Sequence, residues 1–249
     1  MKNRVLMAVM VGACMVAPKA YAFDWFDKVV DVLESETSGS SSSSSVSGLS
    51  SSEISTGLRD ALRIGTQQVV AQLGVRDGFN LDPKAHIPLP GALGRVDRAL
   101  SSVGMGGLTD DLELRLNRAA EVATPKAKAL FLKAIQEMTI TDAKNILTGP
   151  DNAATSYLRK TMGGDLEKEM QPIIKNAMAS AGAVKAYDSV MGQYAQIPFM
   201  PDVKANLNGY VTDKAMDGIF YYVAQEEAAI RKDPVKRTTD ILKKVFAAQ

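Results

Sequence analysis

Cysteine, histidine and tryptophan each occur once in the 249-residue chain, and aromatic residues make up only 6% of it. A single cysteine, Cys14, and a single histidine, His86, exclude the usual zinc ligand sets and nearly all Ser–His or Cys–His catalysis. We therefore expect no metal and no cofactor, and we expect His86 to lie at the surface or to anchor a loop. The glycine-rich stretch 104–107 lacks the lysine and the preceding strand of a phosphate-binding loop.

The chain also lacks an excess of either charge, because 29 basic residues stand against 28 acidic ones. Nucleic-acid-binding proteins usually carry a clear basic excess, so this balance argues against nucleic acid as a partner. Alternating strand patterns longer than four residues and tight hairpin signals are missing as well. The remaining signal is a long succession of helical patterns.

The N-terminus has the order of a secretory signal. Lys2 and Arg4 form a positive region, an uncharged and mostly apolar run covers 5–17, and Ala20 and Ala22 supply the small side chains that a signal peptidase requires. The apolar run is too short to cross a bilayer core, which needs about 20 residues. We predict export to the bacterial periplasm with cleavage after Ala22.

A lipoprotein is the alternative, because Val11-Gly12-Ala13-Cys14 loosely fits a lipoprotein processing box. Lipid on Cys14 would anchor the chain, and we expect membrane contact only in that case. Cleavage after Ala22 instead removes Cys14 together with three basic residues and no acidic one, which leaves 26 basic and 28 acidic residues. The mature chain would then have no disulfide, no thiol nucleophile and a slight negative charge.

Two short segments precede the main body of the mature chain. Residues 23–34 place Phe23, Phe26 and Val30 on one side of a helix and acidic residues on the other. Residues 35–52 are serine-rich, which indicates a flexible linker. A single short helix is marginal alone in water, so we expect this amphipathic segment to dock on the body of the same protein. Another protein or a membrane surface is the alternative, although the acidic face of the segment disfavours anionic lipid.

The body, residues 53–249, is predicted to be one all-α domain, a bundle of about nine or ten helices without significant β-sheet. Capping residues and glycine or proline stops place the expected helices at about 53–73, 91–103, 109–122, 124–138, 141–147, 151–162, 165–181, 183–195, 212–232 and 234–249. Thr124-Pro125 in particular has the pattern of a helix start. Residues 75–92 form a long proline-containing loop, which is either functional or pinned over the core.

Two pairs of opposite charge have the spacing of neighbours on a helix. Arg118 and Glu121 lie three positions apart, and Glu227 and Arg231 lie four apart. We favour surface ion pairs, which are the commoner use of this spacing. An inward-facing polar network, or a site that holds the polar group of a ligand, is the alternative.

Two carboxylates supply the remaining candidate chemistry. Asp213 and Asp217 lie four positions apart, with Tyr221 one turn further on, and could bind a hard cation or share a proton. Acids are also common in the first turn of a helix, which is the simpler explanation. The candidate polar or ligand site therefore comprises Arg118, Glu121, Asp213, Asp217, Tyr221, Glu227 and Arg231, with no residue assigned as catalytic.

Short motifs spread along the body carry a family resemblance. They are Gly-Leu-Arg-Asp-Ala-Leu at 57–62, Ile-Pro-Leu-Pro at 87–90, Leu-Asn-Arg-Ala-Ala-Glu at 116–121, Asp-Ala-Lys-Asn-Ile-Leu at 142–147, Tyr-Val-Thr-Asp-Lys-Ala-Met-Asp-Gly at 210–218, Arg-Lys-Asp-Pro at 231–234 and Lys-Val-Phe at 244–246. From about 49 to 247 the chain resembles the bacterial domain-of-unknown-function family numbered 4197. The resemblance implies an exported protein, mainly of Gram-negative bacteria, and implies no activity for any residue.

These features favour a non-enzymatic periplasmic binding or interaction module. A groove between helices would take a peptide, a lipid-like molecule or a helix of an envelope protein. One alternative is a carboxylate-dependent hydrolase that uses Asp213, Asp217 or Glu121 and would need two of these acids to converge in a cleft. The other is a structural envelope protein that assembles into stable oligomers.

Overall fold

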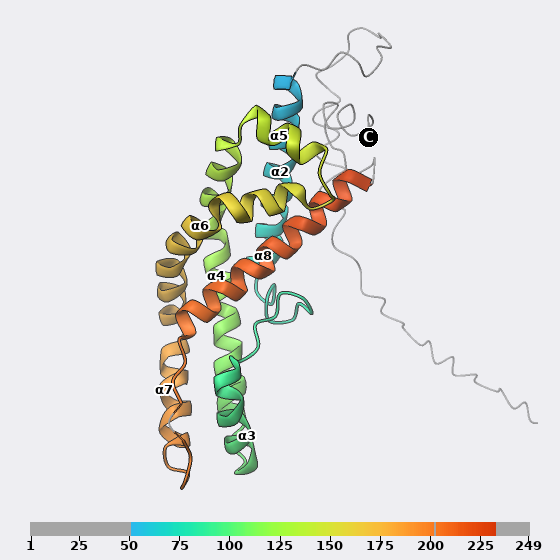
Figure 1. The fold of residues 1–249 in the computed structure, drawn as a ribbon. Helices are drawn as coiled ribbons and strands as arrows, with labels where there is room; N and C mark the ends of the chain where they lie inside the picture. The colour runs from blue at the N-terminus through green and yellow to red at the C-terminus, as the bar shows by residue number, and fades with distance from the viewer. Residues whose placement is uncertain (1–50, 202, 233–249) are drawn as a thin grey trace, which may run out of the picture. The chain divides into compact units, whose positions relative to one another are not determined.

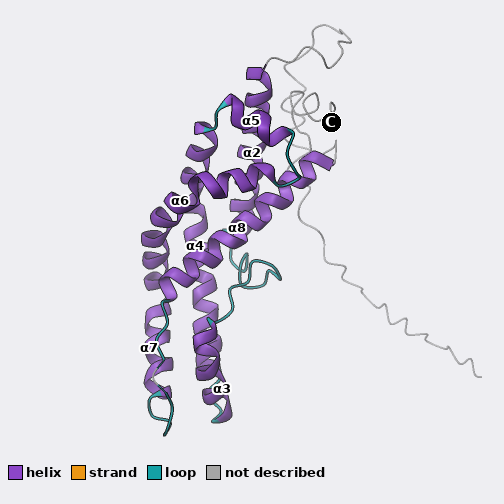
Figure 2. Cartoon of the chain, in the orientation of Figure 1, coloured by secondary structure: helices purple, strands orange, loops and turns teal. Residues whose placement is uncertain are grey.

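The computed structural model describes residues 51–201 and 203–232, and this part of the chain is helical without any strand (Figure 1, Figure 2). Its elements are α2 (Ser51–Leu73), the 3-10 helix η2 (Gly91–Leu93), α3 (Gly94–Ser102), α4 (Gly107–Glu137), α5 (Ile140–Leu147), α6 (Ala153–Ser180), α7 (Ala183–Tyr194) and α8 (Leu207–Lys232). The predicted all-α class is confirmed. The predicted signal peptide, amphipathic segment, most of the serine-rich linker and the last helix lie outside the described residues.

The described residues contain seven α-helices, so the prediction of nine or ten was wrong for this part of the chain. Two pairs of expected helices are continuous: 109–122 joins 124–138 in α4, and 151–162 joins 165–181 in α6. Pro125 lies inside α4, and the hydroxyl of Thr124 donates to the Ala120 carbonyl at 2.8 Å instead of capping a new helix. The helix continues because proline removes only one backbone donor, while tertiary packing favours the uninterrupted helix.

Helix α4 is the centre of the bundle, and α2, α6, α7 and α8 all pack against it. Its inner face carries four fully buried alanines, Ala119, Ala120, Ala123 and Ala127. Side chains this small let neighbouring helices approach closely, while larger residues such as Phe131 fill the remaining core. In Figure 1, α8 crosses α4 and α6, and α3 lies beside α7.

None of the helices in the described part of the chain combines the length and the apolar character needed to cross a bilayer.

Candidate functional site

The first predicted ion pair fastens a loop and is not on the surface. One nitrogen of Arg118, Nη1, donates to Glu121 Oε2 at 2.7 Å, and the other, Nη2, donates to Asp77 Oδ1 at 2.7 Å. Glu121 Oε1 accepts the backbone N–H groups of Phe79 at 3.2 Å and Asn80 at 3.1 Å. Because the Glu121 side chain is only 4% exposed, the predicted surface pair was wrong, and the inward-facing alternative describes it.

That loop, residues 74–90, is here called the strap, and α4 holds it at further points. The amide of Asn117 pairs with the backbone of Ile87, accepting its N–H at 2.9 Å and donating to its carbonyl at 2.8 Å. Glu113 accepts the N–H of Leu89 at 2.9 Å and lies 3.0 Å from Nε2 of His86, whose Nδ1 lies 2.9 Å from a strap carbonyl. His86 therefore anchors the loop, as the sequence led us to expect.

Helix α8 holds the strap from its other side. The Tyr222 hydroxyl donates to Asp82 Oδ2 at 2.6 Å, and the Tyr210 hydroxyl donates to the Pro88 carbonyl at 2.9 Å. Burial, followed by the hydrogen bond to Asp82 and the negative charge of that residue, raises the pKa of Tyr222, so this phenol remains a donor. Gly218 lets the strap pack closely against α8, because a Cβ at this position would lie 3.1 Å from a ring carbon of Phe79. Of the two roles considered for this loop, the contacts favour pinning over the core.

The second predicted ion pair, Glu227 with Arg231, joins the ends of two other helices. Glu227 Oε1 and Oε2 accept the backbone N–H groups of Ala154 and Thr155, at 2.8 and 2.9 Å, in the first turn of α6. Arg231 Nη2 donates to Glu227 Oε1 at 2.9 Å and to the penultimate carbonyl of α5 at 2.8 Å. Both side chains are about 5% exposed or less, so a surface pair was wrong here too. The pair is here called the helix-end junction.

A third helix end is held by a residue that sequence patterns did not single out. Arg115 on α4 donates from Nε to Asp111 at 2.7 Å and from Nη1 to the carbonyl of Ala181, the C-cap residue of α6, at 2.8 Å. Gly182 follows with a φ of +76°, and a Cβ on it would lie 2.6 Å from Arg115 Nη1. The arginine and the glycine thus terminate α6 together.

The remaining candidates lie on the outer face of α8. Asp213, Asp217 and Tyr221 are all exposed, and Asp217 Oδ1 accepts from Arg159 Nη1 on α6 at 2.9 Å. Partial burial and nearby acids, Asp217 among them, raise the pKa of Asp213. Glu121 bonds to the strap, whereas Asp213 and Asp217 lie exposed on the outer face of α8. Within the described ranges, no group of three or more acidic, histidine or cysteine side chains could hold a metal ion.

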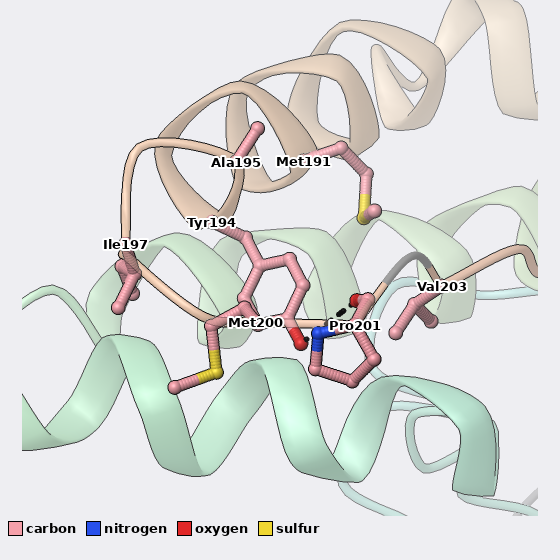
Figure 3. Close-up of a pocket in the computed structure, with 7 residues that line it drawn as sticks. All are labelled: Met191, Tyr194, Ala195, Ile197, Met200, Pro201 and Val203. Carbon is pink, nitrogen blue, oxygen red and sulfur yellow. Dashed lines mark hydrogen bonds between the residues drawn. The ribbon is translucent and has the colours of Figure 1, made fainter.

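A pocket of about 260 Å³ lies where α7 ends and the chain turns toward α8 (Figure 3). Its lining residues are Met191, Tyr194, Ala195, Ile197, Met200, Pro201 and Val203. All have apolar side chains except Tyr194, whose hydroxyl donates to the Pro201 carbonyl at 3.2 Å. Met191 and Met200 flank the Tyr194 ring. This pocket is formed by one helix and the segment after it, and not by two facing helices.

Phe199 lies in the same turn and is fully exposed. Its φ of +64° belongs to the left-handed region, which costs a residue with a Cβ roughly 1–2 kcal/mol. Met200 beside it is 43% exposed. Strained backbone that presents an apolar side chain to solvent is typical of functional segments. Sequence patterns did not single out this turn, because Ile-Pro-Phe-Met-Pro has no periodic spacing.

The fold and its contacts define a class: an all-helical protein with a central long helix, a polar-fastened strap and an exposed apolar turn. A family model described as "Protein of unknown function (DUF4197)" matches residues 48–247, and the chain belongs to that family. The resemblance carried by the sequence motifs is thereby confirmed. Neither the curated proteins nor the solved structures contain a match to this chain.

Proposed function

We propose that this protein is an exported, non-catalytic interaction module of the bacterial periplasm. Its contact site is the α7–α8 turn, defined as residues 195–201 and 203–206. Support for export comes from the N-terminal sequence, where a positive start, an uncharged apolar run and the small residues Ala20 and Ala22 occur in the order of a cleavable signal.

Support for a non-catalytic role comes from the use of the charged candidates. Glu121 and Glu227 each accept at least two backbone N–H groups and one arginine, which occupies both oxygens of each carboxylate. Asp217 pairs with Arg159 across two helices. A general acid or base needs a carboxyl group that is free to exchange a proton with a substrate in a cleft. These side chains instead fasten the strap, the helix-end junction and the outer face of α8.

The exposed Phe199 beside the pocket is the observation that carries the proposal. Covering a phenylalanine side chain on binding gains about 1.5–3 kcal/mol, which is available only if a partner removes the ring from water. The folded chain meanwhile holds this residue in a strained backbone conformation. A turn with no partner would gain nothing from the exposed ring of Phe199 or from its strained backbone. Aromatic and methionine side chains such as those of this turn are enriched at protein interfaces.

Site-specific photo-crosslinking in Gram-negative cells tests the proposal. The full chain carries a benzophenone amino acid either at Phe199 or, as a matched control, at Leu81, which is 75% exposed on the strap. After illumination and osmotic release of the periplasm, we expect a discrete crosslinked species from position 199 and none from position 81. The released chain should begin at Phe23 by mass. Retention of the chain in the cytoplasm, or equal crosslinking from both positions, would contradict the proposal.

A further inference from the structure

We infer that His86 fastens the strap as an imidazolium cation, so that the strap is held more tightly in mildly acidic than in alkaline solution. This role of His86 is separate from the interaction role proposed for the α7–α8 turn. Its basis is the surroundings of the imidazole ring. His86 Nδ1 lies 2.9 Å from the backbone carbonyl oxygen of Asn80, and His86 Nε2 lies 3.0 Å from Glu113 Oε1.

Both ring nitrogens of His86 thus face oxygen atoms that only accept hydrogen bonds. A backbone carbonyl oxygen cannot donate, and neither can an ionised carboxylate. A neutral imidazole has one N–H group and one bare nitrogen, so it donates to one of these oxygens and turns a lone pair toward the other. The imidazolium form has two N–H groups and satisfies both oxygens. The two contacts together therefore require the charged ring.

The proton that makes both contacts possible belongs to the ring and not to Glu113. Glu113 Oε2 accepts the backbone N–H of Leu89 at 2.9 Å, and this hydrogen bond stabilises the ionised carboxylate. Free histidine is also a stronger base than free glutamate by about two pH units. A proton between the two side chains is therefore held by His86, and the contact is an ion pair between the strap and α4.

The other ionisable side chains of this region keep one charge state between about pH 6 and pH 9, because carboxyl groups ordinarily titrate near pH 4 and phenols, amines and guanidinium groups near pH 10 or above. They are Arg76, Asp77, Asp82 and Lys84 on the strap, Glu113, Arg118 and Glu121 on α4, and Tyr210 and Tyr222 on α8. Burial, followed by the charge of Glu113, raises the pKa of Tyr210 further. A change in the strap within this range therefore points to His86, the only histidine of the chain.

Loss of the proton as the pH rises removes one of the two contacts. The stabilising contribution of the charged ring is present below about pH 6.5, the ordinary histidine value, and is lost when the folded chain releases the proton at higher pH. The bonds from Glu121 to Phe79 and Asn80 do not depend on His86. Loosening should therefore be confined to the end of the strap at residues 86–89. The His86 side chain is 34% exposed, so solvent protons reach it and the effect is modest.

Amide hydrogen exchange measured by NMR between about pH 6 and pH 8.5, the range around the ordinary histidine value, tests this coupling on mature chain without a histidine tag. Rates are converted to protection factors, which remove the intrinsic pH dependence of exchange. We expect the protection of the Leu89 N–H to fall about threefold or more as the pH rises, the size expected of a partly exposed ion pair. The fall should follow the ring ¹⁵N signals of His86. The N–H groups of Phe79 and Asn80 are the internal control and should keep their protection.

Two variants and a matched control assign the change to this contact. His86→Gln and Glu113→Gln should each abolish the pH dependence at Leu89. Asp110→Asn removes an exposed acid one turn earlier on α4 and should retain it. Far-UV circular dichroism checks the fold of each variant, and the wild-type titration decides alone if a variant does not fold. Constant protection of Leu89 while the His86 ring loses its proton would overturn the inference. Wild-type pH dependence in His86→Gln or in Glu113→Gln would also overturn it.

Discussion

Replacing Glu227 with glutamine should destabilise the protein strongly, because this carboxylate holds four groups at once, one of them the Thr155 hydroxyl at 2.8 Å. It accepts two N–H groups from the first turn of α6 and pairs with Arg231, which in turn bonds to the end of α5. A glutamine amide keeps one acceptor oxygen, but its NH₂ group is itself a donor and would face the donors that the carboxylate now accepts. It also leaves the charge of Arg231 buried without its partner. Breaking one side of a buried ion pair typically costs 3–5 kcal/mol, so we expect a loss of about 3–4 kcal/mol.

A loss of this size is measurable because a domain has roughly 5–15 kcal/mol of stability in all. Urea unfolding of the mature chain, followed by far-UV circular dichroism, gives the free energy of unfolding for each variant. Glu226→Gln is the matched control, since Glu226 is the residue just before Glu227 on α8 and is partly exposed. We expect this control to change the free energy by no more than about 0.5 kcal/mol.

The double variant with Arg231→Met tests whether the lost partner is the cause. Because much of the cost of Glu227→Gln comes from a buried charge left alone, removing that charge should recover at least about 1 kcal/mol relative to the sum of the two single losses. Strict additivity, or a Glu227→Gln variant as stable as the Glu226→Gln control, would refute the argument that the helix-end junction holds α5, α6 and α8 together.

Further predictions concern packing, pH and backbone strain. Gly218→Ala should destabilise the protein by about 1 kcal/mol or more, because the added Cβ would press on the strap. Gly192→Ala on α7 should stabilise it by about 0.5–1 kcal/mol, because alanine favours the helix and its Cβ meets no neighbour there. Thermal unfolding compares the two variants. Hydrogen bonds from Thr139 lower the pKa of Asp142. The carboxylate therefore adds stability above about pH 4, and this contribution is lost as the pH falls through the lowered pKa. In a profile of unfolding free energy against pH, Asp142→Asn should reduce the loss of stability at acid pH. The pKa of Asp213 is raised, so its charge opposes folding at neutral pH; Asp213→Asn should stabilise the chain slightly there, and the gain should vanish below about pH 4. Phe199→Gly should raise the free energy of unfolding by about 1 kcal/mol, because glycine adopts a positive φ without strain; an unchanged or lowered value would argue against strain at this turn.

Helical periodicity predicted the fold class, because long runs of apolar positions with polar caps leave little choice of secondary structure. The same reasoning divided α4 and α6 wrongly, since a local start signal such as Thr124-Pro125 carries no information about the neighbours that pack across it. The four buried alanines of α4 explain why the helix continues, and their contacts come from helices distant in sequence. Element boundaries therefore depend on tertiary packing that local signals do not encode.

The charged pairs show a related limit. Spacing indicated correctly that Glu227 and Arg231 would meet, and that Arg118 and Glu121 would meet, but not that both pairs would be buried. What buries them is backbone from elsewhere: the strap in one case and the ends of α5 and α6 in the other. A carboxylate that accepts backbone N–H groups is stabilised in its charged form, which makes burial tolerable. That requirement becomes visible only when the helix ends are placed in space.

The two left-handed non-glycine residues in the described part of the chain differ in a way that bears on function. Asp77 has a φ of +68°, but aspartate is among the residues that tolerate this region, and its carboxylate bonds to both Asn80 and Arg118. The strain at Asp77 is thus offset by contacts that fasten the strap. Phe199 has a φ of +64° and a fully exposed ring, so the folded monomer draws no packing energy from its side chain. No contact within the described residues offsets this strain, which is why the proposed interaction role is placed at this turn.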